Sequence, residues 1–107
     1  PSLAKDISFF IPNNKLTIEM DTNKQVSWSD ENDFFELIRE VVGDLMEEVK
    51  LSDSFYNKKS NKYSRTYKFL YSPNDPGMKD PGEFTKLVND NQTNLRELLK
   101  KMDLELR

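Results

Sequence analysis

Cations and aromatic rings alternate along one acid-free segment of the chain, residues 54–74, and together such side chains can neutralise phosphates and stack on nucleobases. The chain as a whole carries a formal net charge of -3, so positive charge is concentrated in this segment. A net-acidic chain cannot attract phosphate from a distance, and any contact with a nucleic acid would therefore be local. The alternative is that the lysines only keep a hairpin soluble and block edge pairing. The segment holds the cations Lys58, Lys59, Lys62, Arg65 and Lys68 and the aromatic residues Phe55, Tyr56, Tyr63, Tyr67, Phe69 and Tyr71.

The chain has few of the side chains that catalysis or metal binding usually needs. The chain contains no Cys and no His, which removes thiolate nucleophiles, disulfides, the commonest general base and the commonest transition-metal ligand. The carboxylates Glu47, Glu48, Asp103 and Glu105 fall in segments where a solvated face explains them. We therefore expect no catalytic residues and no metal site in this chain.

The elements that must position the basic aromatic segment can be predicted from apolar spacing. From Phe34 onward the apolar residues have the spacing of one helical stripe, with capping oxygens before it and Gly43 as its stop signal. Asp80, Pro81 and Glu83 form the start signal of a second helix. Strands are predicted over residues 6–12, 48–56, 63–72 and 103–107, and a small inserted hairpin over residues 15–20 and 25–28.

The resulting order is strand, helix, strand, strand, helix, strand, which predicts an α+β, ferredoxin-like βαββαβ sandwich. Two helices would cover one face of an antiparallel sheet, and the other face would stay open for a partner. In the third strand Tyr67, Phe69 and Tyr71 should face the helices, while Ser64, Thr66, Lys68 and Leu70 face away from them. In the second strand Val49, Leu51 and Phe55 should share one face.

The first strand should place an aromatic ring on the open face. If Ile7, Phe9 and Ile11 are in the core, then Ser8 and Phe10 point to the opposite side, next to Thr66 and Lys68. A ring beside a cation on an open sheet suits base stacking with phosphate neutralisation. The alternative is that the inserted hairpin, and Trp28 in particular, covers Phe10.

The length of 107 residues fits one domain, and no apolar run approaches the roughly 18 residues that cross a bilayer. The chain begins at Pro1 and enters a strand almost at once, which suggests a piece of a longer protein. We expect a single domain over residues 1–107, with an insertion at about residues 13–29.

Several short stretches, in order along nearly the whole chain, resemble one family. The sequence is similar to the C-terminal ferredoxin-fold anticodon-binding domain of phenylalanyl-tRNA synthetases, especially the single-chain organellar form. Residues 13–29 are longer than this family usually shows, and Ser72 stands where the family has a basic residue. The matching stretches are residues 5–9, 32–34, 43–45, 48–49 and 51–55, with Lys59, Lys62, Ser64, Tyr67, Lys68 and Tyr71.

The resemblance implies a class II parent enzyme that joins phenylalanine to its tRNA with ATP and Mg²⁺, whereas this domain itself would need no cofactor. Its implied partners are the anticodon stem-loop of phenylalanine-accepting tRNA and the parent's catalytic domain in cis, without a membrane. The parent would be a monomer in the mitochondrial matrix or another organelle, or alternatively in the cytoplasm. A different function, docking of the open sheet onto a protein, remains an alternative. The expected RNA-binding residues are Ser8, Phe10, Thr66 and Lys68 for base contact and its surroundings, and Lys5, Lys59, Lys62 and Arg65 for phosphate.

Overall fold

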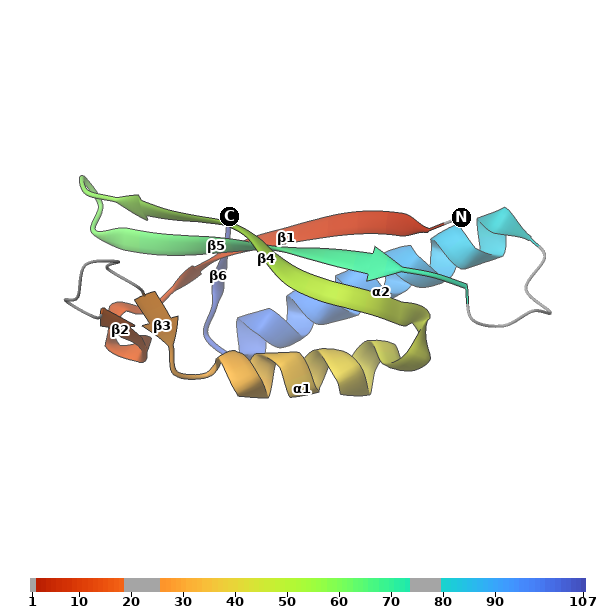
Figure 1. The fold of residues 1–107 in the computed structure, drawn as a ribbon, viewed down its shortest axis with the longest axis horizontal. Helices are drawn as coiled ribbons and strands as arrows, with labels where there is room; N and C mark the ends of the chain where they lie inside the picture. The colour runs from red at the N-terminus through yellow and green to blue at the C-terminus, as the bar shows by residue number, and fades with distance from the viewer. Residues whose placement is uncertain (1, 19–25, 74–79) are drawn as a thin grey trace.

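A computed structural model describes residues 2–18, 26–73 and 80–107 as a two-layer α+β fold (Figure 1). A four-stranded antiparallel sheet forms one layer, with both long helices on the same side of it. The elements are β1 (Leu3–Ile11), β2 (Leu16–Ile18), β3 (Val26–Trp28), α1 (Glu31–Val42), β4 (Met46–Asn57), β5 (Lys62–Tyr71), α2 (Pro81–Lys101) and β6 (Glu105–Leu106), with single 3₁₀ turns at Asn13–Lys15 and Gly43–Leu45.

The strand order in the main sheet is β4-β5-β1-β6, with every neighbouring pair antiparallel. The first and third main strands, β1 and β5, are therefore the central neighbours, as the ferredoxin-like prediction requires. The inserted hairpin is confirmed as a separate two-stranded sheet, in which Leu16 pairs with Trp28. Its predicted turn lies outside the described residues.

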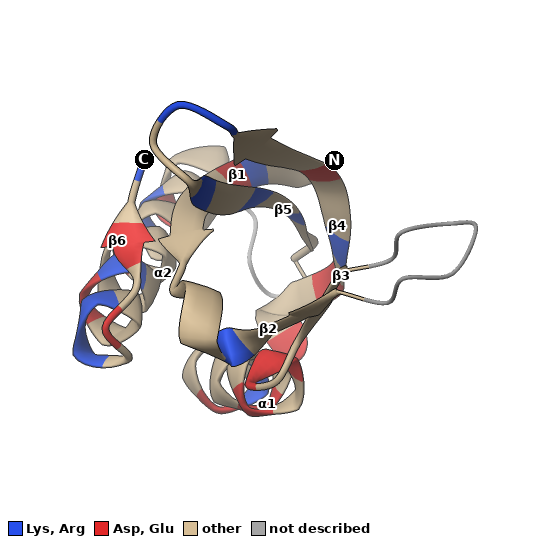
Figure 2. Cartoon of the chain, turned by 90° about the vertical axis from the view of Figure 1, so that its left-hand side faces the viewer, with Lys and Arg blue, Asp and Glu red and all other residues tan. Residues whose placement is uncertain are grey.

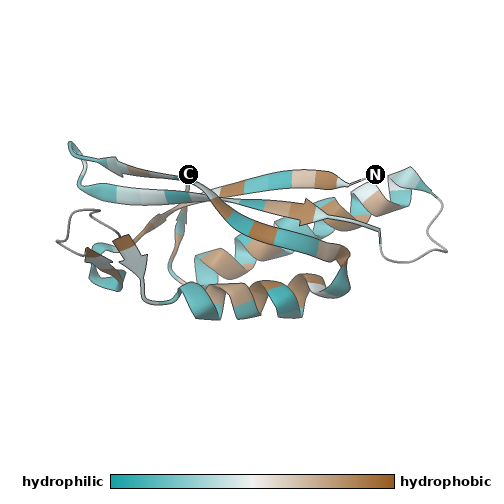
Figure 3. Ribbon diagram, viewed as in Figure 1, coloured by the Kyte–Doolittle hydropathy of each residue, from teal (hydrophilic) through white to brown (hydrophobic). Residues whose placement is uncertain are grey.

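The start of α2 and the end of α1 lie where the sequence provides the signal. In α2, Asp80 is the N-cap and its carboxylate accepts a hydrogen bond of 2.9 Å from the backbone N–H of Gly82. In α1, the C-cap is Gly43, whose φ of 64° lies in the left-handed region that suits glycine. Apolar and polar residues alternate along both helices (Figure 3), and the buried ones include Phe34 and Ile38 of α1 and Val88 and Leu95 of α2.

The core lies between the sheet and the helices and is rich in aromatic rings. The ring of Phe9 in β1 lies 5.5 Å from Trp28 and 5.5 Å from Phe34 of α1, centroid to centroid, and stacks on Tyr67 of β5 at 5.8 Å. The buried stripe of α2 runs through Gln92 and Leu99.

One strand face was predicted wrongly. Val49 and Leu51 lie opposite Phe69 and Tyr67 on the helix side, but the register shifts between Leu51 and Asp53. This bulge reverses the alternation, so that Phe55 lies opposite Ser64 on the face away from the helices. We call that face, formed by β4, β5, β1 and β6, the open face.

Candidate nucleic-acid interface

The open face carries a polar row across the two central strands. Ser8 of β1 lies directly opposite Thr66 of β5, and their hydroxyl oxygens are 2.6 Å apart. Both side chains are half-buried, because neighbouring side chains flank them in the sheet. The pairing fixes both hydroxyls on the face that the sequence predicted.

A second row contains Lys68, which is exposed on β5 between Lys50 of β4 and Asp6 of β1. Two lysines directly opposite each other on one sheet face repel, and such a pair costs stability unless an anion lies between them. In the part of the chain that the structure describes, neither ammonium group is in an ion pair. The pair is therefore well placed for a phosphate.

Phe10 also lies on the open face, half-buried, and Trp28 does not cover it. Trp28 packs instead against Phe9, which points to the opposite side of β1. The ammonium of Lys62 lies 5.1 Å from the centroid of the Phe10 ring and forms an ion pair of 3.1 Å with Glu105. Lys62 is therefore held beside the ring, in a pair exposed enough to exchange with another anion.

A cavity of about 250 Å³ adjoins the Phe10 ring, where β1 ends and the β4–β5 hairpin begins. Its lining includes Asn13, Asn61, Lys62 and Glu105. The amide of Asn13 donates a hydrogen bond of 3.0 Å to the backbone carbonyl of Asn61, which holds the two loops together. The cavity therefore combines an aromatic wall with polar groups.

Lys59 lies in the exposed turn that joins β4 to β5. Asn57 shapes this turn, since its side-chain oxygen accepts from the backbone N–H of Lys59 at 3.0 Å. The turn is basic at its tip, whereas α1 in the other layer is rich in acidic residues (Figure 2). The sheet layer nevertheless holds acids of its own, since Asp6 lies opposite Lys68 and Glu105 pairs with Lys62.

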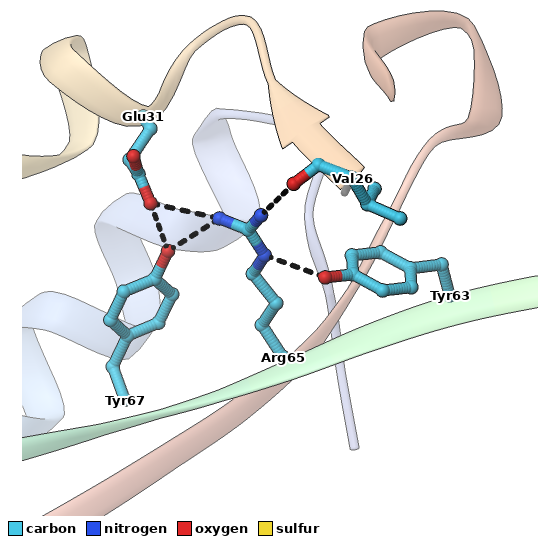
Figure 4. A network of polar contacts seen from close by, with 5 residues as sticks. All are labelled: Val26, Glu31, Tyr63, Arg65 and Tyr67. Carbon is cyan, nitrogen blue, oxygen red and sulfur yellow. Dashed lines mark hydrogen bonds and ion pairs between the residues drawn. The ribbon is translucent and has the colours of Figure 1, made fainter. Parts of the chain in front are cut away.

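Arg65 was expected to contact phosphate, and the structure corrects that expectation. Its side chain points toward the helices and is only 5 % exposed. The guanidinium donates to the hydroxyls of Tyr63 and Tyr67, each at 2.9 Å, and to the carbonyl of Val26 at 2.9 Å (Figure 4). It also forms an ion pair of 2.8 Å with Glu31 at the start of α1. Alternate residues of β5 face the helices, and Arg65 lies between Tyr63 and Tyr67 in that series.

The same network restrains its tyrosine. Burial, together with the hydrogen bond that Tyr67 donates to Glu31 at 2.8 Å, raises the pKa of the Tyr67 hydroxyl well above its ordinary value. The hydroxyl therefore stays protonated and donates to the carboxylate while it accepts from Arg65. The network joins the inserted hairpin, α1 and the sheet.

Lys5 is also separated from the open face. It lies opposite Phe69 on the helix side of β1, at the end of the strand away from Phe10, and is half-buried. A phosphate on the open face would not reach it together with Lys62.

Sequence reasoning missed three open-face residues: Lys50, Phe55 and Arg107. Lys50 was assigned only to a strand, and Phe55 was placed on the same face as Val49 and Leu51, because the bulge that reverses its face leaves no clear mark in the sequence. The side chain of Arg107 donates a hydrogen bond of 3.4 Å to the hydroxyl of Ser64, and its backbone N–H donates to the carbonyl of Ser8 at 2.9 Å. The pairing of β6 with β1 could have indicated it, had the register been known.

No group of three acidic residues within the described ranges could hold a metal ion, and no helix in those ranges is long and apolar enough to span a bilayer. The interface therefore offers stacking surfaces, hydroxyls and ammonium groups. Groups of this kind can stack on bases and neutralise phosphates.

The chain has relatives among proteins of known name, although no family model matches it. It is 37 % identical over 108 residues to the chloroplastic/mitochondrial phenylalanine–tRNA ligase of Arabidopsis thaliana, which covers 100 % of this chain and 21 % of the relative. It is 37 % identical over 99 residues to the mitochondrial phenylalanine–tRNA ligase of Dictyostelium discoideum, covering 92 % of this chain and 18 % of the relative. The mitochondrial phenylalanine–tRNA ligase of Saccharomyces cerevisiae is 39 % identical over 75 residues, or 70 % of this chain and 14 % of the relative. The chain thus spans about a fifth or less of these proteins.

Proposed function

This chain is a relative of the organellar phenylalanine–tRNA ligases, and on that premise we propose that it is the tRNA-binding domain of such a ligase. It holds the anticodon stem-loop of phenylalanine-accepting tRNA, so that the acceptor end reaches a catalytic domain in the rest of the protein. Holding the substrate in this way removes part of the entropic cost of the reaction. The catalytic domain, of class II, supplies the phenylalanylation and uses ATP and Mg²⁺.

The observation that carries the proposal is the composition of the open face, in a chain whose whole length aligns with such a ligase. Ser8, Thr66 and Phe10 offer hydroxyls and a ring to bases, and Lys68 offers charge beside them. Lys62 and Lys59 continue the cationic surface toward the hairpin turn. Lys50 lies opposite Lys68 and adds to the charge offered to phosphate. Arg65 is buried and Lys5 lies on the helix side of β1, so neither belongs to the proposed RNA-binding surface.

The rest of the proposal follows from the relatives. The names of the relatives place them in mitochondria or chloroplasts, which supports an organellar location for this chain. Of these locations we propose the mitochondrial matrix. We take residues 1–107 as one domain of a longer, monomeric protein, with its catalytic domain as the partner in cis.

A charge reversal tests the assigned face. Lys68→Glu should weaken binding of phenylalanine-accepting tRNA by at least about tenfold, because it replaces an attraction to phosphate by a repulsion. The matched control is Lys86→Glu, which reverses an equally exposed lysine on α2 in the other layer. Binding is measured by titration of labelled tRNA with the chain at fixed salt. Equal effects of the two variants would overturn the open face as the tRNA site.

A further inference from the structure

We propose that the open face binds two neighbouring unpaired bases, one stacked on Phe10 and the other on Phe55, with Arg107 and Lys62 neutralising the phosphates beside them. This inference rests on the proposed RNA-binding function and adds the residues that two of the loop bases contact. The ligand is a single-stranded loop with splayed bases, since stacking on a protein ring requires an unstacked base face.

The two rings belong to one row of the sheet. Phe55 of β4 lies opposite Ser64 of β5, and Ser64 lies opposite Phe10 of β1. Residues directly opposite each other in an antiparallel sheet point to the same side, so all three are on the open face. Neighbouring strands are roughly 4.8 Å apart, which places the two phenylalanine positions about 10 Å from each other. That is a span that two consecutive nucleotides of an extended strand can bridge.

The burial of Ser64 shows that this row is a continuous surface. Ser64 is only 1 % exposed, although it lies on the face that the helices do not cover. Its hydroxyl donates a hydrogen bond of 3.5 Å to the carbonyl of Phe55 and accepts one from Arg107. Neighbouring side chains must therefore cover the small serine, and its neighbours on this face include Phe10, Phe55 and Arg107.

Phe55 has no structural reason to be exposed. It is 54 % exposed, and of the seven phenylalanines it is the only one in the exposed class. Apolar rings in solvent are common singly, but this ring has a second ring and cations as neighbours on the same surface. Lys62 lies beside Phe10, and Arg107 bonds to Ser64, so a cation lies next to each of these residues of the row. Rings and cations in one patch are what binding of single-stranded nucleic acid requires.

The test compares two adjacent aromatic residues on opposite faces of β4. Phe55→Leu should weaken binding of the anticodon stem-loop RNA of phenylalanine tRNA by at least about fivefold, the lower end for loss of one base–ring stack. The matched control is Tyr56→Leu, because Tyr56 is 45 % exposed, follows Phe55 in the chain and lies opposite Tyr63 on the helix side. The control should bind within about twofold of the unsubstituted chain.

A second probe asks whether a base is what Phe55 contacts. A series of stem-loop RNAs carries one abasic nucleotide, at each loop position in turn. At one position the abasic nucleotide should lower the affinity for the unsubstituted chain but not the affinity for Phe55→Leu. A different, adjacent position should do the same for Phe10→Leu. This is a double-mutant cycle, in which coupling reports direct contact. Phe55→Tyr keeps the ring and should restore binding, and a duplex of the stem without the loop should bind at least about tenfold more weakly.

The outcomes separate this inference from the function on which it rests. If Lys68→Glu weakens binding but Phe55→Leu and Tyr56→Leu do not differ, the chain binds RNA through its open face and the second stacking site is wrong. If coupling appears at one loop position only, the two-base arrangement is wrong. If no stem-loop RNA binds the unsubstituted chain, the inference and the proposed function are both overturned.

Discussion

Arg65 and Glu31 form an ion pair of 2.8 Å that joins the centre of the sheet to the first turn of α1. The two residues are far apart in the sequence, and the same guanidinium also holds the carbonyl of Val26 in the inserted hairpin. The single arginine of the basic segment therefore serves the fold, whereas its lysines, Lys58, Lys59, Lys62 and Lys68, are exposed at the surface.

Removing Arg65 should destabilise the domain strongly. Arg65→Ala leaves two tyrosine hydroxyls, a carboxylate and a carbonyl without their buried donor, which should lower the free energy of unfolding by about 3 kcal/mol or more. Glu31→Gln should cost less, about 2 kcal/mol, because it removes the counter-charge of the buried guanidinium but its amide oxygen still accepts a hydrogen bond. Urea unfolding measures both. A cost for Arg65→Ala no larger than that of Lys68→Ala would contradict the network.

The faces of the central strands could be predicted from the sequence, and the edges could not. Strict alternation in β1 and β5 was enough to place Ser8, Phe10, Thr66 and Lys68 on one side. The same alternation, applied consistently, would also have placed Arg65 on the buried side.

The predictions for the two edge strands were wrong or incomplete for physical reasons. In β4 the bulge between Leu51 and Asp53 inserts a residue without a glycine or proline to signal it, so the face of Phe55 was reversed. In β6 only two residues pair with β1, too few for a periodicity to set the register of Arg107. The sequence therefore predicted the part of the candidate site that lies on the central strands, but not Phe55 and Arg107 on the edge strands.

The inserted hairpin is part of the core, and Trp28 is the residue that makes it so. Trp28 is buried, with its ring centroid 5.5 Å from Phe9 and 5.2 Å from Phe34. Trp28→Ala should lower the free energy of unfolding by about 3–5 kcal/mol, through lost burial and the cavity left behind. Ile18→Ala, at a position of the same hairpin that is 55 % exposed, should change it by no more than about 0.5 kcal/mol. Equal, small effects in thermal or urea unfolding would mean that the hairpin does not pack on the domain.

Alkaline pH should unfold the domain through its buried tyrosines. Burial raises the pKa of Tyr71 to about 12 from 10.0, and its hydroxyl donates to the side-chain oxygen of Gln92. Above pH 10 the unfolded chain loses this proton while the folded chain keeps it, so stability falls with rising pH, by about 1.4 kcal/mol per pH unit for each such tyrosine. The loss should continue to about pH 12 for Tyr71. Tyr67, whose pKa is also raised, should add to it.

Urea unfolding at a series of alkaline pH values measures this slope, and near-ultraviolet absorbance reports when tyrosinate forms. Tyr71→Phe is the control, since it removes one titrating group and should make the slope shallower, even though it lowers stability at neutral pH by leaving Gln92 without its donor. A slope that is the same in Tyr71→Phe would show that Tyr71 does not govern the alkaline transition.

The dependence of binding on salt should distinguish RNA from a protein partner on the open face. Each lysine that neutralises a phosphate of single-stranded RNA contributes about -0.7 to the slope of log affinity against log salt concentration. Lys68→Gln and Lys50→Gln should each make the slope for the anticodon stem-loop shallower by about that amount, and Lys86→Gln on α2 should leave it unchanged. Titrations at several salt concentrations give the slopes. A slope near zero for the unsubstituted chain would contradict phosphate contact and favour the competing function, in which the same open face docks onto a protein.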